Sequence, residues 1–167
     1  LDAFGKTGNK APKLKMHCIN RVPFARGLGS SSAAAVSGLV AAQVVSEGFF
    51  SEDDMIQMAT AIDGHPDNVL PALLGGVVIG ATNHEGKMIA KKMAPPEGLY
   101  TYALIPDYPL ATSKARAAMP DGYSREDVVY NLGHLGLLVA ALATGDLGLL
   151  KDAFADRVHE PYRLPLM

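Results

Sequence analysis

The stretch PFARGLGSSSAAA, residues 23–35, decides how this sequence is expected to fold. Gly27 and Gly29 lack a Cβ, so an anion can lie directly against the main chain here. The alanine-rich run that follows has apolar residues at helical spacing and predicts a helix over about 31–46, buried nearly all round. Amide groups at a helix start have no partners inside the helix, and the dipole adds positive charge. The stretch therefore predicts an anion-binding loop, with a tight turn capped by serines as the alternative.

The composition limits the classes of function that need to be considered. The chain has 167 residues, 49% of them hydrophobic and 19% charged, with a formal net charge of −2. This is ordinary globular composition, and we expect no nucleic-acid partner because no basic surface is indicated. The apolar run at 33–45 is too short to cross a membrane, so we expect no membrane partner. Cys18 is the only cysteine, which favours a reducing, cytoplasmic location.

Alternation and turn signals predict three β-structures in a mixed α and β chain. Residues 14–20 and 99–105 alternate or concentrate apolar residues and are expected to be strands. The segment 75–93 contains two apolar runs around NHEG, which predicts a hairpin. A composition shift at 93–96 favours a domain boundary there. The chain starts at Leu rather than Met, which we interpret as a sign that it is a piece of a longer protein.

Capping signals predict where the remaining helices begin and end. Ser51 and Ser124 each open an S-x-x-D sequence typical of a helix amino terminus. Gly64 and Gly145 fit the corresponding carboxyl ends. The apolar stripes of these helices are expected to face the core. Further helices are expected at the following places: after His65, from Thr112 to Met119, and over about 147–158.

An expected strand is followed by the loop P-x-x-x-G-L-G-S-S and then by an alanine-rich helix. This order resembles the second motif of the GHMP small-molecule kinases. It matches neither a Walker A loop nor the G-x-G-x-x-G dinucleotide fingerprint. Within that family, three further stretches are similar, in order, to the homoserine kinases, so that the resemblance covers nearly all of residues 15–167. The stretches are GHPDNVLPALLGGVVI at 64–79, LIPDYPLATSKARAAMP at 104–120 and HEPYRLPLM at 159–167.

The resemblance implies a GHMP kinase fold of the α+β class. Residues 1–95 would form part of its ribosomal-S5-like amino-terminal domain, and residues 96–167 part of its ferredoxin-like carboxyl-terminal domain. The implied reaction is ATP-dependent phosphorylation of L-homoserine to O-phospho-L-homoserine, a step of threonine biosynthesis, with ATP and Mg²⁺ as cofactors. The family's first and third motifs are absent, so these residues alone are expected to be inactive. The alternatives are another GHMP kinase or a non-catalytic nucleotide-binding fragment, and a homodimer stays open.

The resemblance also assigns nucleotide and metal contacts to individual residues. Serine hydroxyls can donate to phosphate or ligate Mg²⁺, and Ser31 is the first choice for the metal, with Ser30 as the alternative. Asp63 is the nearest acid for the same metal, because Ala61 stands where some relatives carry Glu; a surface acid at a helix end is the alternative for Asp63. The nucleotide-binding set is Pro23, Arg26, Gly27, Leu28, Gly29, Ser30, Ser31 and Ser32.

Four residues are candidates for substrate binding. Asn68 matches the asparagine that contacts the acceptor hydroxyl, and its amide can both donate and accept. Arg116 matches the arginine that grips the substrate carboxylate, for which a guanidinium fork is suited. Thr112 and its neighbour Ser113 are expected to assist Arg116, and Arg163 is a second candidate for the amino-acid site. No residue qualifies as a general base, so catalysis is expected to come from alignment by Asn68 and Arg116 and from charge neutralisation. A helix cap is the alternative for Asn68, and a solvated surface charge for either arginine.

Overall fold

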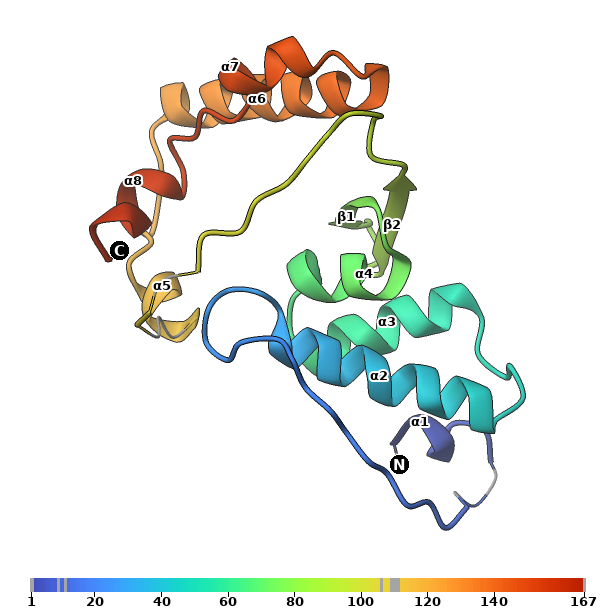
Figure 1. The fold of residues 1–167 in the computed structure, drawn as a ribbon. Helices are drawn as coiled ribbons and strands as arrows, with labels where there is room; N and C mark the ends of the chain where they lie inside the picture. The colour runs from blue at the N-terminus through green and yellow to red at the C-terminus, as the bar shows by residue number, and fades with distance from the viewer. Residues whose placement is uncertain (1, 9, 11, 106, 109–111, 167) are drawn as a thin grey trace. The chain divides into compact units, whose positions relative to one another are not determined.

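The chain contains both helices and a sheet, which confirms the α+β class, and it divides into two units (Figure 1). The first unit consists of Leu1–Phe24 and Leu28–Met93, and the second of Ala25–Gly27 and Ala94–Met167. Each unit is described separately below. The structure is a computed structural model and describes residues 2–8, 10, 12–105, 107–108 and 112–166.

Helices account for most of the regular secondary structure of the first unit. The short helix α1 (Asp2–Gly5) contacts α2 (Ser30–Val45), and α2, α3 (Glu52–Asp63) and α4 (Pro66–Leu74) pack on one another. The predicted capping box at α3 is confirmed, because Ser51 and Asp54 bond each other's main-chain N–H groups. Gly64, at φ 82°, ends α3 in the left-handed conformation, as predicted.

The predicted hairpin is confirmed and forms the sheet of the first unit. Strands β1 (Val77–Thr82) and β2 (Met88–Met93) are antiparallel, with Val77 opposite Met93. Helix α4 approaches β1 very closely, because a Cβ at Gly80 would lie 2.5 Å from Cδ1 of Leu70. A glycine at this position of the strand therefore lets the helix and the hairpin share one core.

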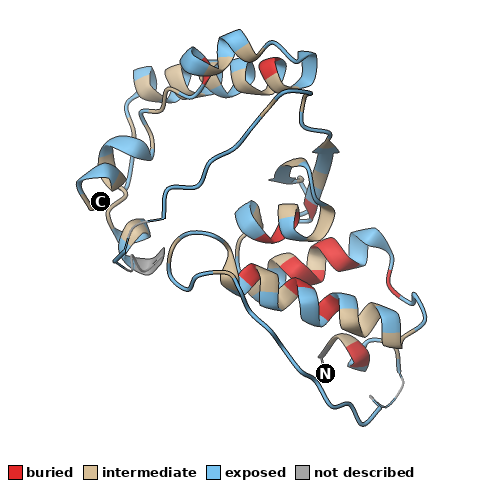
Figure 2. Ribbon diagram, in the orientation of Figure 1, coloured by how far each residue is buried: buried red, intermediate tan, exposed pale blue. Residues whose placement is uncertain are grey.

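The core of the first unit lies where α2, α3, α4 and β2 meet (Figure 2). The prediction that α2 is buried nearly all round is wrong: Val40 and Val44 are exposed. Helices α3 and α4 cover one side of α2, so small residues on the other side do not indicate burial. Ile62 of the predicted α3 stripe is exposed as well. The buried cluster is Val36, Leu39, Phe50, Met55, Ile56, Met58, Ala59, Val69, Leu70 and Met88.

Two predicted strands are not strands in this structure. Residues 14–20 and 99–105 run without regular ladder pairing, and their apolar side chains, such as Ile19 and Leu104, are exposed. Alternating apolar residues indicate that a segment can pair and pack on one face, but a strand exists only where a second strand pairs with it. Among the described residues, only β1 and β2 pair in a sheet.

Among the described residues of the second unit, the regular elements are all helices. Its longest helix, α6 (Arg125–Thr144), starts at the predicted cap Ser124, whose hydroxyl accepts from the Asp127 N–H, and ends at Gly145. The single helix predicted over 147–158 is wrong, because a 3-10 turn at 147–149 leads directly into a short α-helix that ends at 153. The other elements are α5 (Thr112–Ala117), η1 (Leu147–Leu149), α7 (Leu150–Ala153), α8 (Glu160–Arg163) and η2 (Leu164–Leu166).

The apolar stripe of α6 is exposed rather than buried, which corrects a second core prediction. Val128, Leu132 and Leu135 are all exposed, and Ala141 is the buried residue of this helix. Short elements, α7 and η1, are what pack on α6 within the unit. By length and composition, α6 could cross a membrane, whereas the run at 33–45 is too short. Core helices of soluble proteins meet the same criterion.

Candidate active site

The first turn of α2 offers main-chain N–H groups to a ligand. Gly29 is the N-cap residue, with φ 70° and ψ 33°, and no side chain caps the helix. The first main-chain hydrogen bond of the helix runs from the Ala33 N–H to the Gly29 carbonyl at 2.8 Å. The N–H groups of residues 30–32 precede it, and helix geometry gives them no partner. Together with the helix dipole, they form an arrangement that favours an anion.

Asn68 lies against this turn from the neighbouring helix. A Cβ at Gly29 would stand 3.1 Å from Cβ of Asn68 and 3.3 Å from its Cγ. Asn68 belongs to the first turn of α4, which opens with Pro66 in the first helical turn. The amino-terminal ends of two helices therefore meet here, and both contribute positive dipole charge beside an exposed side-chain amide.

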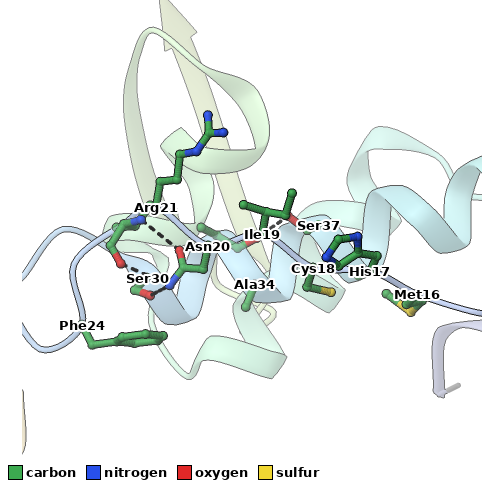
Figure 3. A pocket seen from close by; sticks show the side chains of 13 residues that line it. Met16, His17, Cys18, Ile19, Asn20, Arg21, Phe24, Ser30, Ala34 and Ser37 are labelled. Atoms are coloured by element: carbon green, nitrogen blue, oxygen red, sulfur yellow. Dashed lines mark hydrogen bonds between the residues drawn. The ribbon is translucent and has the colours of Figure 1, made fainter.

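The three serines of the loop differ in what their hydroxyls bond. Ser30 Oγ accepts from Asn20 Nδ2 at 3.2 Å (Figure 3). Ser32 is buried, and its Oγ donates to Asp63 Oδ2 at 2.6 Å. The Ser31 side chain is exposed, and its hydroxyl makes no hydrogen bond within the described part of the chain. Of the three hydroxyls, that of Ser31 is the one available to a ligand.

Asp63 is the buried acid of this site. It is the last residue of α3, and its side chain is only 6% exposed, so it is not the surface acid considered as an alternative. The Nδ1 atom of His65 lies 3.8 Å from Asp63 Oδ2 and 3.5 Å from Asp67 Oδ1, beyond good hydrogen-bond distance. This nitrogen is buried and has no hydrogen-bond partner among the described residues.

A divalent cation would find oxygen ligands here, but not a complete protein cage. In the described residues, no group of three or more His, Cys, Asp or Glu side chains is close enough to hold a metal. Magnesium is commonly held by one or two carboxylates together with phosphate oxygens and water. The buried carboxylate of Asp63 and the exposed hydroxyl of Ser31 are oxygen donors of the type this ion prefers. The residues present therefore fit a magnesium ion that is coordinated by phosphate oxygens as well as by the protein.

Asn20 is a structural residue of the loop that the sequence interpretation missed. Its Oδ1 accepts from the Val22 N–H at 2.9 Å, and its Nδ2 donates both to the Val22 carbonyl and to Ser30 Oγ at 3.2 Å. An asparagine that bonds the main chain two residues on is typical of an Asx-turn, and the sequence N-R-V-P carries that signal. Asn20 therefore links the segment before the loop to the start of α2.

A cavity of about 540 Å³ lies between that preceding segment and α2 (Figure 3). Small residues of the exposed side of α2, including Ala34 and Gly38, form one wall, and Ile19 and Phe24 belong to the other. The exposed side of α2 thus borders a groove rather than a packed core.

The remaining loop residues have distinct conformations and contacts. Pro23 and Leu28 are exposed. Gly27 has φ 71°, a conformation that favours glycine. Arg26 groups with the second unit, where its Nη2 donates to the Asp107 carbonyl at 2.9 Å. In this structure, the Arg26 guanidinium therefore bonds the main chain of the second unit.

The predicted substrate residues other than Asn68 belong to the second unit. Thr112 begins α5, and its side chain lies outside the described part of the structure. Arg116 is exposed in the last turn of the same helix. Arg163 ends α8, and its Nε is buried without a hydrogen-bond partner among the described residues. The first unit thus brings together Asn68, Asp63 and the serines, while the arginines form a separate set.

Known proteins resemble this chain in sequence and in fold. Residues 1–76 match the GHMP kinases N terminal domain. The homoserine kinase of Moorella thermoacetica is 41% identical over 98% of this chain and 55% of its own length, and that of Deinococcus radiodurans is 42% identical over 97% and 52%. A crystal structure of homoserine kinase from Cytophaga hutchinsonii superposes with a TM-score of 0.80 at 29% identity, covering 89% of this chain and 48% of that one.

The chain spans about half the length of the curated relatives it matches. These relatives are similar to it from one end of the chain to the other, and the matched domain includes the whole glycine-serine loop. The resemblance first noted in residues 23–35 is confirmed by this agreement. The chain belongs to the GHMP kinase family, and its relatives over nearly its whole length are homoserine kinases.

Proposed function

We propose that the protein containing this chain transfers the γ-phosphoryl group of ATP to the hydroxyl of L-homoserine, giving O-phospho-L-homoserine for threonine biosynthesis. The relatives named homoserine kinase support this substrate. The observation that carries the proposal is the start of α2, where N–H groups without a side-chain cap lie beside Asn68. It combines an anion site with an amide suited to an alcohol, as phosphoryl transfer to a hydroxyl requires.

In this proposal, the ATP phosphates lie against the loop of residues 23–32 and the first turn of α2. Phosphoryl transfer depends on positioning and on neutralising charge, so fixed N–H groups are effective without covalent help. Ser31 and Asp63 would hold Mg²⁺, which supplies further neutralisation of phosphate charge when it is bound. The exposed Ser31 hydroxyl and the buried Asp63 carboxylate favour this pair over Ser30, whose oxygen already accepts from Asn20.

Asn68 would orient the acceptor hydroxyl. Its side chain is exposed beside Gly29 and is therefore within reach of a group bound at the turn. An amide can bond an alcohol without removing its proton. We propose that no protein side chain acts as general base and that the hydroxyl loses its proton to the γ-phosphate or to solvent. The rate would come from alignment of the hydroxyl with the phosphoryl group.

The second unit would supply recognition of the amino acid. Arg116 is proposed to hold the homoserine carboxylate in two parallel hydrogen bonds, assisted by Thr112 and Arg163. An exposed guanidinium on α5 is available for such a ligand. The Arg163 Nε also has no hydrogen-bond partner among the described residues, so it could bond an acceptor on the substrate. A cytoplasmic location stays a prediction, and a homodimer stays open.

An acceptor screen on the intact protein tests the proposed substrate. Purified protein is incubated with Mg-ATP and, in separate reactions, with L-homoserine, mevalonate, phosphomevalonate or galactose, and the phosphorylated products are identified by mass spectrometry. We expect O-phospho-L-homoserine and at most trace phosphorylation of the other acceptors. Preferred phosphorylation of a sugar or of mevalonate would contradict the proposed substrate while leaving the family unchanged.

A further inference from the structure

Asp63 occupies a position that is unfavourable for a carboxylate. It ends α3, where the partial charge of the helix dipole is negative, and the last turn of this helix has no basic residue. Its side chain is 6% exposed, and no lysine or arginine forms an ion pair with it in the described part of the chain. The titratable group that faces it is His65, whose Nδ1 lies 3.8 Å from Oδ2. Burying a carboxylate with no closer cationic group is costly, so this arrangement is not explained by fold stability.

One neutral hydroxyl supports this carboxylate. Ser32, in the first turn of α2, is 1% exposed, and its Oγ donates to Asp63 Oδ2 at 2.6 Å. The other carboxylate oxygen, Oδ1, accepts no hydrogen bond from any described residue. Ser32 belongs to the predicted nucleotide-binding set, and in this structure its hydroxyl bonds Asp63. The hydrogen bond joins the helix that starts at the anion site to the acid beside it, 31 residues away.

We infer that Ser32 is a positioning residue whose hydroxyl fixes the Asp63 carboxylate so that its second oxygen is kept for a divalent cation. This inference rests on the proposed nucleotide and magnesium site. A hydrogen bond from a neighbouring side chain commonly orients a metal-ligating carboxylate and is needed for full metal affinity. Ser32 then contributes to the site in two ways: its main-chain N–H faces the anion as part of the helix start, and its side chain holds the acid.

The test measures metal binding without turnover. Manganese stands in for magnesium, and its binding to the intact protein is followed by electron paramagnetic resonance in the presence of a non-hydrolysable ATP analogue. We expect Ser32→Ala to weaken manganese binding by about 10–100-fold, the usual effect of losing such a support. Ser37→Ala is the matched control, because Ser37 lies on the same helix and its hydroxyl donates to the Ala33 carbonyl at 2.7 Å rather than to Asp63. This control should bind manganese like the wild type.

A double-mutant comparison separates support of Asp63 from direct contact with the ligand. In an Asp63→Asn background, Ser32→Ala should cause little further loss of manganese affinity, because the group on which Ser32 acts has already been changed. Ser32→Thr keeps the hydroxyl and should retain most of the affinity. Folding is checked by circular dichroism. If Ser32→Ala folds poorly, Ser32→Cys replaces it in both backgrounds, because a thiol fills the same space but is a weak hydrogen-bond donor.

Three results would overturn the inference. These are wild-type manganese affinity in Ser32→Ala, an undiminished effect of Ser32→Ala in the Asp63→Asn background, and a wild-type protein that binds no manganese with the analogue. Failure of the proposed substrate would be recognised separately. In that case, manganese and the analogue would bind as expected, yet homoserine would not be phosphorylated.

Discussion

Gly29 and Asn68 are in such close contact that the first cannot carry a side chain without moving the second. A Cβ built on Gly29 would stand 3.1 Å from Cβ of Asn68, and Gly29 has φ 70°, a conformation that disfavours any residue with a Cβ. The turn into α2 and the first turn of α4 are thus fixed against each other. The proposed phosphate site and the proposed acceptor-orienting amide share one rigid contact.

Gly29→Ala should therefore impair both stability and activity. The left-handed backbone costs roughly 1–2 kcal/mol for a residue with a Cβ, and the contact with Asn68 adds to this. We expect a fall of that size in the free energy of unfolding of the intact protein, together with at least a tenfold loss in kcat/KM. Urea denaturation and steady-state kinetics measure the two effects.

Gly86→Ala is the matched control for this variant. Gly86 has φ 76°, but a Cβ there would meet nothing within 4 Å. It should reproduce the backbone cost and leave kcat/KM at the wild-type value. Equal losses of kcat/KM in the two variants would show that the contact between Gly29 and Asn68 does not contribute to activity.

Asn68→Ala tests the proposed orientation of the acceptor. Removing the amide should lower kcat by roughly 10–100-fold, the range expected when a reacting group loses its alignment. ATP binding should change little, because the N–H groups of α2 remain. Initial rates at saturating homoserine and the KM for ATP give both quantities. A fully active variant would remove Asn68 from the proposed mechanism.

Local signals in the sequence predicted the parts of the fold that depend on a few neighbouring residues. Ser51 and Gly64 mark the ends of α3, and the turn at 83–86 joins a hairpin whose two strands are adjacent in the chain. The expected strand at 14–20 was wrong because alternation indicates a pairing face but does not supply the paired strand. The burial of α2 was overestimated for a related reason: small apolar side chains suit a core, but they do not determine how many neighbours cover the helix.

The candidate site could be predicted only where it is continuous in the chain. The glycine-serine loop is one short segment, and it forms a helix start without a side-chain cap, on which the anion site is proposed. The bond from Ser32 to Asp63 joins residues 31 positions apart, so no spacing rule could assign the serine to the acid. The difference among the three serines likewise depends on Asn20 and Asp63, which come from outside the loop.

Arg116→Ala tests the proposed recognition of the amino acid. Loss of a two-bond contact to a carboxylate should raise the KM for homoserine by roughly 10–100-fold, with the KM for ATP little changed. Arg116→Lys should not restore binding, because an ammonium group cannot reproduce the planar fork. Lys114→Ala, on the same helix and also exposed, is the control and should behave like the wild type. An unchanged KM for homoserine in Arg116→Ala would contradict the assignment.

Asp156 is expected to make the second unit sensitive to acid. Burial tends to raise the pKa of its carboxyl, but hydrogen bonds from Asn131 Nδ2 and from the N–H groups of residues 158–160 outweigh burial and hold the pKa well below its usual range. A carboxyl whose pKa is lower in the folded state stabilises the fold above its unfolded pKa, about 3.9. That contribution is lost as the pH falls from this value through the folded pKa.

Asp156→Asn should therefore lower the free energy of unfolding of the intact protein by about 1–2 kcal/mol at neutral pH, because an amide cannot accept all of these hydrogen bonds. The difference from wild type should stay constant between about pH 5 and 8 and shrink below about pH 4. Urea denaturation across this pH range measures it. Asp152→Asn, at an exposed carboxylate of α7, is the control and should show little difference at any pH. A difference between Asp156→Asn and wild type that grew as the pH fell would reverse the expected sign and contradict the lowered pKa.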